Sequence, residues 1–98
     1  MTLEEKKIIE KKAAKNIANY ELKKTDWYVT RYAETGTPIP AAITTYRTAL
    51  RDKCNAIETA VNACVTEEDF NALFEIPMDD EGNFTGYAVI ENWPTLEE

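Results

Sequence analysis

Seven residues spaced alternately four and three apart make the stretch from 40 to 64 the most constraining feature of this chain. Such heptad spacing places all seven on one face of a helix. Because Pro40 suits a first helical position, the sequence predicts one long central helix over about residues 40–64. Three repeats are few for a free-standing coiled coil, so we expect packing in a small bundle or against a partner. The seven residues are Ile43, Arg47, Leu50, Cys54, Ile57, Val61 and Cys64, with Tyr46 beside them.

Residues 1–24 predict a charged N-terminal helix. Thr2 and Glu5 have the spacing of a capping box, and Lys23 and Lys24 stand near the far end, where the helix dipole favours cations. The apolar residues form only a thin stripe, which cannot offset much of the cost of ordering a helix. We therefore expect this helix to pack on the rest of the chain, another copy or a different protein. The stripe consists of Ile9, Ala13, Ile17 and Tyr20, with Leu3 and Leu22 nearby.

Residues 25–64 have the pattern of a helix-turn-helix core. Thr25 or Asp26 can cap a short helix, and Gly36 suits the left-handed position at which a helix ends. Each proline of Thr37–Pro40 disfavours helical angles in the residue before it, which predicts an extended turn. The long central helix follows that turn.

Residues 65–98 form an acidic C-terminal segment. Thr66 and the acids after it predict a short helix near residues 67–74. Beyond it, Asp79–Asn83 has turn composition, and Phe84–Ile90 is prone to form a strand that could pair back on Phe74–Ile76. A small β-hairpin near residues 75–90 is thus compatible with the sequence. The expected fold class is mainly α: a small helical bundle or helical hairpin.

The composition argues against catalysis. The chain has no histidine and only three glycines. It cannot by itself build a Ser-His-Asp or Cys-His site or an imidazole metal site, and a glycine-rich loop for a cofactor is hard to assemble. We expect a protein that is not an enzyme, with no catalytic residues and no cofactor.

The net charge of −7 is unevenly distributed. Residues 1–24 carry +3, residues 25–64 carry zero, and residues 65–98 carry ten acids and no base, or −10. A negative domain is a poor binder of nucleic acid. The acidic segment could serve solubility, or it could meet a basic partner or the basic N-terminal segment of another copy.

No metal, disulfide or membrane segment is expected. On one continuous helix, Cys54 and Cys64 would hold their Cα atoms about 15 Å apart, too far for a disulfide. Two cysteines without histidine fall short of a zinc site, and Asp79–Asn83 lacks the ligand spacing of a calcium loop. No stretch is long and apolar enough to span a bilayer, and the N-terminus lacks a signal peptide's apolar core, which favours a cytoplasmic product.

Aromatic and arginine side chains gather near the turn and the terminus. Such residues dominate binding hot spots, and they also anchor small cores, which must take at least half of them here. Arg47 on the seam and Arg31 beside Trp27 each need a carboxylate or an aromatic face. Asp26 and Glu34 are the local carboxylates. The aromatic residues concerned are Trp27, Tyr28, Tyr32, Tyr46 and Trp93.

Three stretches together resemble a known family. They read TDWYVTRYAETGTPIP at residues 25–40, YRTALR at residues 46–51 and WP at residues 93–94. They follow the pattern D-W-Y-V-x-R-x-x-E-T-G-x-x-[IV]-P, then Y-R-x-x-L-R. This is similar to the tail assembly chaperones of tailed bacteriophages, also known as tail-fibre assembly proteins. The resemblance covers about residues 25–53 and the closing Trp93-Pro94.

The resemblance implies a non-enzymatic phage helper that binds a tail or tail-fibre protein and assists its folding or assembly. It also implies action in the cytoplasm of the infected host, with retention in the virion tail as the other location. Carried over by position, the expected partner-binding residues are Trp27, Tyr28, Arg31, Glu34, Tyr46, Arg47, Arg51 and Trp93. The same residues could equally hold the helix-turn-helix corner together.

Two other functions stay open. The chain could be a small structural subunit of the tail, baseplate or fibre that stays in the virion and forms a homo-oligomer. It could also be a host-interaction protein that binds a basic factor through residues 65–98.

Overall fold

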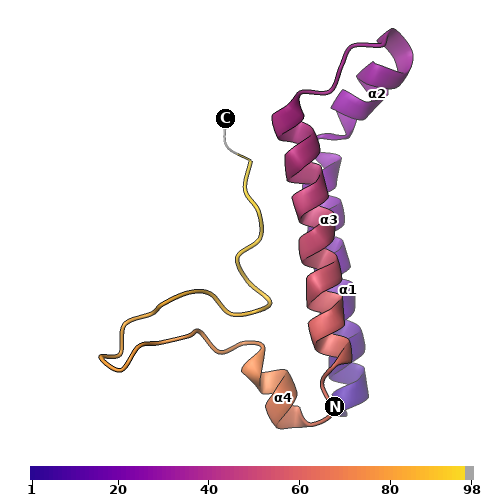
Figure 1. Cartoon of the computed structure of the whole chain (residues 1–98). Coiled ribbons are helices and arrows are strands. Elements are labelled where there is room, and N and C mark those ends of the chain that lie inside the picture. Colours follow the sequence, from indigo (N-terminus) through magenta and orange to yellow (C-terminus); the bar gives the residue numbers. More distant parts are fainter. Residues whose placement is uncertain (97–98) are drawn as a thin grey trace.

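The computed structural model describes residues 1–96, along which four helices follow one another (Figure 1). They are α1 (Leu3–Lys23), α2 (Asp26–Thr35), α3 (Ala41–Asn62) and α4 (Glu67–Ala72). α1 and α3 lie side by side and run in opposite directions, with α2 at one end of the pair and α4 at the other (Figure 1). The prediction of a mainly helical chain, a helical hairpin around one long helix, is confirmed.

Side chains at the helix ends explain where the helices begin and stop. Thr2 Oγ1 accepts from the backbone N–H of Glu5 at 3.2 Å, as the capping-box spacing predicts. Thr66 and Asp69 form a complete capping box at α4. Gly36 ends α2 with φ +74°, a left-handed conformation that costs glycine little. Pro40 lies just before α3, one position outside the place that the sequence predicted.

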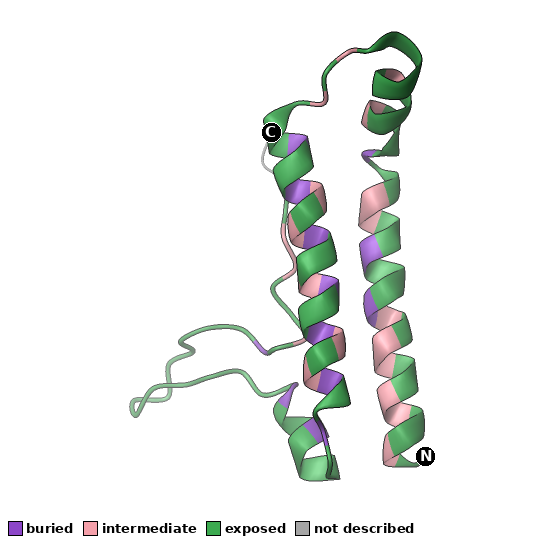
Figure 2. Ribbon diagram, turned by 45° about the vertical axis from the view of Figure 1, so that its right-hand side comes forward, coloured by how far each residue is buried: buried purple, intermediate pink, exposed green. Residues whose placement is uncertain are grey.

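The heptad face of α3 forms the core between the two long helices (Figure 2). Leu50, Ile57 and Val61 are fully buried there. Six of the seven predicted seam residues are buried, and Arg47 is half-buried because its guanidinium reaches the end of α1. Tyr46, predicted to flank the seam, is buried too. The heptad reading of residues 40–64 is therefore confirmed in side-chain burial as well as in helix length.

α1 buries a different face from the one that its large apolar residues suggested. Ala14 and Ala18 are its buried residues, whereas Ile9, Ile17 and Tyr20 are exposed. Small side chains at the contact allow two helices to approach closely. The thin apolar stripe is thus not the core face of α1; it is left largely in solvent along one flank.

The end of the hairpin near the N-terminus is closed by the C-terminal segment. Phe70 of α4 and Leu73 after it pack with Ile57, Val61 and Cys64. The chain then returns along the bundle, where Ala88 is buried and Ile90 and Trp93 pack against the same core. The short helix predicted near residues 67–74 is present, and it ends at Ala72.

The prediction of a β-hairpin near residues 75–90 is wrong. Residues 1–96 contain one isolated antiparallel bridge, between Met78 and Phe84, and no strand. Asp79 fixes the turn between them, because its Oδ1 accepts from the N–H groups of Glu81 and Asn83, each at 2.9 Å. Phe74–Ile76 does not pair with Phe84–Ile90, because a short two-stranded ribbon with no third layer gains little by extending.

The molecule is flat and elongated rather than globular. Its principal extents are 51 × 35 × 16 Å and its radius of gyration is 16.8 Å. A compact domain of this length has a radius of gyration of about 13 Å. Many large apolar side chains therefore remain exposed.

Cys54 and Cys64 are buried free thiols. None of the helices in residues 1–96 combines the length and apolar character that crossing a bilayer requires. Among the same residues, no three acidic or cysteine side chains converge as metal ligands.

Candidate functional site

Arg47 ties α3 to the corner where α1 gives way to α2. Its Nη1 donates to the carbonyl of Leu22 at 2.9 Å, to Thr25 Oγ1 at 2.8 Å and to Asp26 Oδ1 at 3.0 Å. Thr25 is only 2% exposed, and its hydroxyl donates to Leu22. A cation at the carbonyl end of α1 also opposes the negative end of the helix dipole. Arg47 therefore finds Asp26, one of its two predicted carboxylates, and holds the corner.

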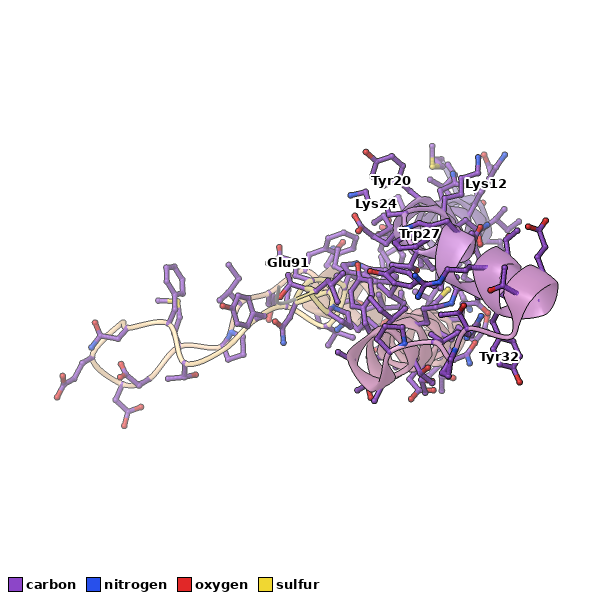
Figure 3. All side chains as sticks on the ribbon, turned by 90° about the horizontal axis from the view of Figure 1, so that it is seen from above. Lys12, Tyr20, Lys24, Trp27, Tyr32 and Glu91 are labelled. Carbon is purple, nitrogen blue, oxygen red and sulfur yellow. The ribbon has the colours of Figure 1, made fainter. Side chains whose placement is uncertain are left out.

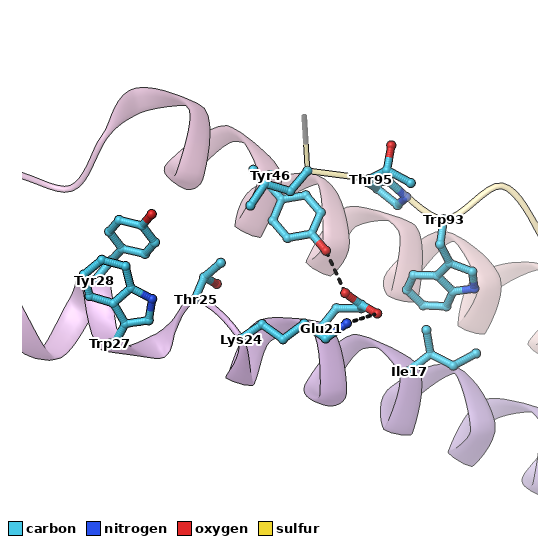
Figure 4. A pocket seen from close by; sticks show the side chains of 11 residues that line it. Ile17, Glu21, Lys24, Thr25, Trp27, Tyr28, Tyr46, Trp93 and Thr95 are labelled. Atoms are coloured by element: carbon cyan, nitrogen blue, oxygen red, sulfur yellow. Dashed lines mark hydrogen bonds and ion pairs between the residues drawn. The ribbon is translucent and has the colours of Figure 1, made fainter. Parts of the chain in front are cut away.

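Tyr46, one residue earlier on α3, reaches the same end of α1. Its hydroxyl donates to Glu21 Oε2 at 3.0 Å, and Glu21 Oε1 lies 3.2 Å from Lys24 Nζ (Figure 4). Burial raises the pKa of the Tyr46 phenol, and the hydrogen bond to Glu21 and its charge raise it further. The phenol thus stays protonated and continues to donate to the carboxylate.

An aromatic-basic cluster lies on α2. The rings of Trp27 and Tyr28 stack with centroids 3.7 Å apart. The guanidinium carbon of Arg31 lies 5.1 Å from the Trp27 ring centroid and 5.6 Å from that of Tyr28. This geometry is that of a cation–π contact, which holds the rings in place while leaving Trp27 52% exposed. The buried Nε of Arg31 has no hydrogen-bond acceptor among residues 1–96.

A groove of about 590 Å³ runs between this cluster and the returning C-terminal segment (Figure 4). Trp27 and Tyr28 lie at one end of the groove and Trp93 at the other. The floor carries the Tyr46–Glu21–Lys24 chain of polar contacts. The lining residues are Ile17, Glu21, Lys24, Thr25, Trp27, Tyr28, Tyr46 and Trp93–Leu96.

The structure brings together four of the eight predicted site residues as groove lining: Trp27, Tyr28, Tyr46 and Trp93. Arg31 supports the first two from behind, and Arg47 holds the corner beneath them. Glu34 and Arg51 do not take part. Both are exposed, and within residues 1–96 neither makes an ion pair.

Sequence reasoning missed part of the groove. Ile17 was predicted only as part of the thin apolar stripe, and Glu21, Lys24 and Thr25 were not predicted as lining residues. For Glu21, the signal was its position in the last turn of α1, facing the predicted seam. Apart from the Trp93-Pro94 pair, nothing in the sequence indicated that residues 94–96 line the groove.

The arrangement suits the binding of a guest. Two indoles, two phenols and the apolar flank of α1 offer stacking and burial to a guest. One carboxylate and one ammonium in the floor can orient it by hydrogen bonds. A groove with aromatic walls and a few convergent polar groups is typical of sites for an extended peptide segment.

Comparisons of this chain with models of known protein families, with curated proteins and with solved structures found no match.

Proposed function

We propose that this protein is a non-enzymatic assembly chaperone for a bacteriophage tail or tail-fibre protein, and that the groove holds a segment of that client. One observation carries the proposal. Trp27 and Trp93 come from the two ends of the pattern that resembles the tail assembly chaperones, and they lie at opposite ends of one groove (Figure 4). A pattern selected only for helix packing does not require its outer members to flank an open groove.

The exposure of the groove supports a client rather than a ligand sealed inside. Trp27 is more than half exposed although it is stacked and held by Arg31. A large aromatic side chain that is rigid and exposed costs little entropy to bury against a partner.

Co-expression with the tail-fibre protein of the same phage tests this function. We expect the wild-type chain to raise the soluble, trimeric fraction of the fibre protein. Trp27→Ala should weaken client binding on the order of thirtyfold, the effect of losing a hot-spot residue of about 2 kcal/mol. Tyr32→Ala is the matched control, because Tyr32 is an exposed aromatic of α2 outside the groove.

If fibre solubility and trimerisation are the same with and without this protein, the chaperone function is wrong. Mass spectrometry of purified particles then distinguishes the alternative. Stoichiometric presence in mature virions would favour a structural subunit of the tail, and absence favours a helper that leaves after assembly.

A further inference from the structure

Residues 75–87 form an arm that projects from the bundle (Figures 1 and 3). The hydrogen bonds of residues 77–85 are made within the arm itself, through the Asp79 turn and between Thr85 and Pro77. The arm rejoins the bundle only at its base, where Lys53 donates to the carbonyl of Val89 at 3.0 Å and Ile90 donates to that of Leu73.

The arm carries large apolar side chains that its own chain does not cover. Phe84 is 69% exposed and Tyr87 65% exposed, and Met78 is also exposed. Ordering a segment costs about 1–2 kcal/mol per residue, which exposed side chains do nothing to offset. A cluster of exposed apolar side chains on such a segment marks an interaction surface.

The tip of the arm is acidic. Asp79 is occupied by the turn, and its hydrogen bonds from the backbone lower the pKa of its carboxyl. Asp80 and Glu81 are exposed and make no hydrogen bond or ion pair through their carboxylates within residues 1–96. The arm therefore offers apolar side chains next to two free negative charges.

α1 carries the complementary surface. The exposed side of α1, away from the buried Ala14 and Ala18, includes Ile8, Ile9, Lys12 and Asn16, with Glu5 one turn before Ile9. Ile8 and Ile9 stand four and three residues before Lys12, so all three side chains are neighbours on the helix. This face offers apolar side chains next to a positive charge. Figure 3 shows Lys12 pointing away from the bundle, and the arm leaves on another side, so the two surfaces cannot meet within one chain.

We propose that the arm of each chain binds the outer face of α1 of a second copy, so that two chains exchange arms in a symmetric dimer. The occupant is a second copy because this chain itself displays both halves of the contact. The acidic tip matches Lys12, and the apolar residues of the arm match Ile8 and Ile9. In a two-fold arrangement, each contact is made twice, so the dimer covers both exposed surfaces of both chains. This self-association is independent of what the groove binds.

Sedimentation equilibrium of the full chain tests the proposal, at about 1 to 100 μM protein, the range in which such a dimer would dissociate. We expect a mass of twice the 11.2 kDa of one chain at the upper end of that range. Since charged contacts are screened by salt, the dimer should weaken on the order of tenfold between about 50 and 500 mM NaCl.

Charge reversal on either surface should break the dimer. The arm variant is Asp80→Lys with Glu81→Lys, and the helix variant is Lys12→Glu with Asn16→Glu. Each should weaken self-association on the order of a hundredfold, because like charges then face each other. Mixing the two variants in equal amounts should restore a dimer, because a basic arm then meets an acidic helix face and an acidic arm meets a basic one.

The matched control carries the same charge change as the arm variant on exposed acids elsewhere: Glu34→Lys with Asp52→Lys. It should dimerise like the wild-type chain. Far-UV circular dichroism of every variant should match that of the wild-type chain, since all six altered residues are exposed. The proposal is overturned if the wild-type chain is a monomer throughout the concentration range. It is equally overturned if the mixture of the two folded variants stays monomeric, in which case the arm and the α1 face do not contact each other.

Discussion

The guanidinium of Arg47 donates to the buried hydroxyl of Thr25 at 2.8 Å, and this contact joins the second turn of α3 to the corner between α1 and α2. Leu22 and Asp26, on either side of Thr25, accept from the same nitrogen. The position of α2, and with it the aromatic end of the groove, depends on this one side chain.

Arg47→Met keeps the apolar stem and removes the donors. Hydrogen bonds to a charged group contribute about 1.5–3 kcal/mol each, and Thr25 would be left buried with one partner fewer. We expect the free energy of unfolding to fall by about 2–3 kcal/mol in urea titrations. Arg51→Met is the control: Arg51 is exposed, so its replacement should change stability by less than about 0.5 kcal/mol. Equal effects of the two substitutions would contradict the role given to Arg47.

Ala18→Leu should separate α1 from α3. Ala18 is buried at the helix contact, and a larger side chain there forces the helices apart or strains its rotamer. Overpacking of this kind typically costs about 1–3 kcal/mol. Thermal unfolding followed by circular dichroism measures the loss. Asn19→Leu places the same side chain one residue on, at an exposed position, and should leave the melting temperature nearly unchanged.

Tyr46 should make stability depend on alkaline pH. Burial, followed by the hydrogen bond and charge of Glu21, raises its pKa above the ordinary value of 10.0. The unfolded chain therefore loses this proton first, and the stabilisation by Tyr46 is complete below pH 10 and declines as pH rises above it. Urea titrations at about pH 8 and pH 11 should show the wild-type advantage over Tyr46→Phe shrinking. An advantage that stays constant with pH would show that Tyr46 ionises alike in both states.

Gly36→Ala should destabilise the chain through its backbone alone. No atom lies within 4 Å of the added methyl group, but φ is +74°, where a side chain is unfavourable by about 1–2 kcal/mol. We expect a loss of about 1 kcal/mol in urea titrations. Gly86→Ala is the counterpart: its φ is not left-handed, and the new methyl would meet Pro77 at an ordinary 3.7 Å. It should be close to neutral.

The sequence predicts the long elements of this fold well because their signals are repetitive. The seam of α3 repeats for three heptads, so one irregular member such as Arg47 does not obscure it. The caps at Thr2 and Thr66 depend on residues three positions away and could be read directly. The β-hairpin prediction was wrong because Phe84–Ile90 has strand propensity but no neighbouring sheet with which to pair.

The core face of α1 and the groove could not be predicted for a different reason. The apolar stripe of α1 is identified mainly from its large residues, such as Ile17 and Tyr20. The contact with α3 instead required the small Ala14 and Ala18. The groove depends on how far the chain returns after the arm, which sets Trp93 beside Ile17. No local pattern encodes that path. The Trp-Pro pair and the aromatic helix were each visible, but their meeting was not.

The closing of the hairpin by Phe70 and Leu73 has a consequence for the order of events during synthesis. α1, α2 and α3 all lie within the first 62 residues, so they can pair as soon as these have left the ribosome. Until residues 63–73 follow, Ile57 and Val61 lack the cover that Phe70 and Leu73 provide. A nascent chain that stalls before residue 70 is therefore a folded hairpin with an exposed apolar end. That end is prone to aggregate until Phe70 and Leu73 cover it.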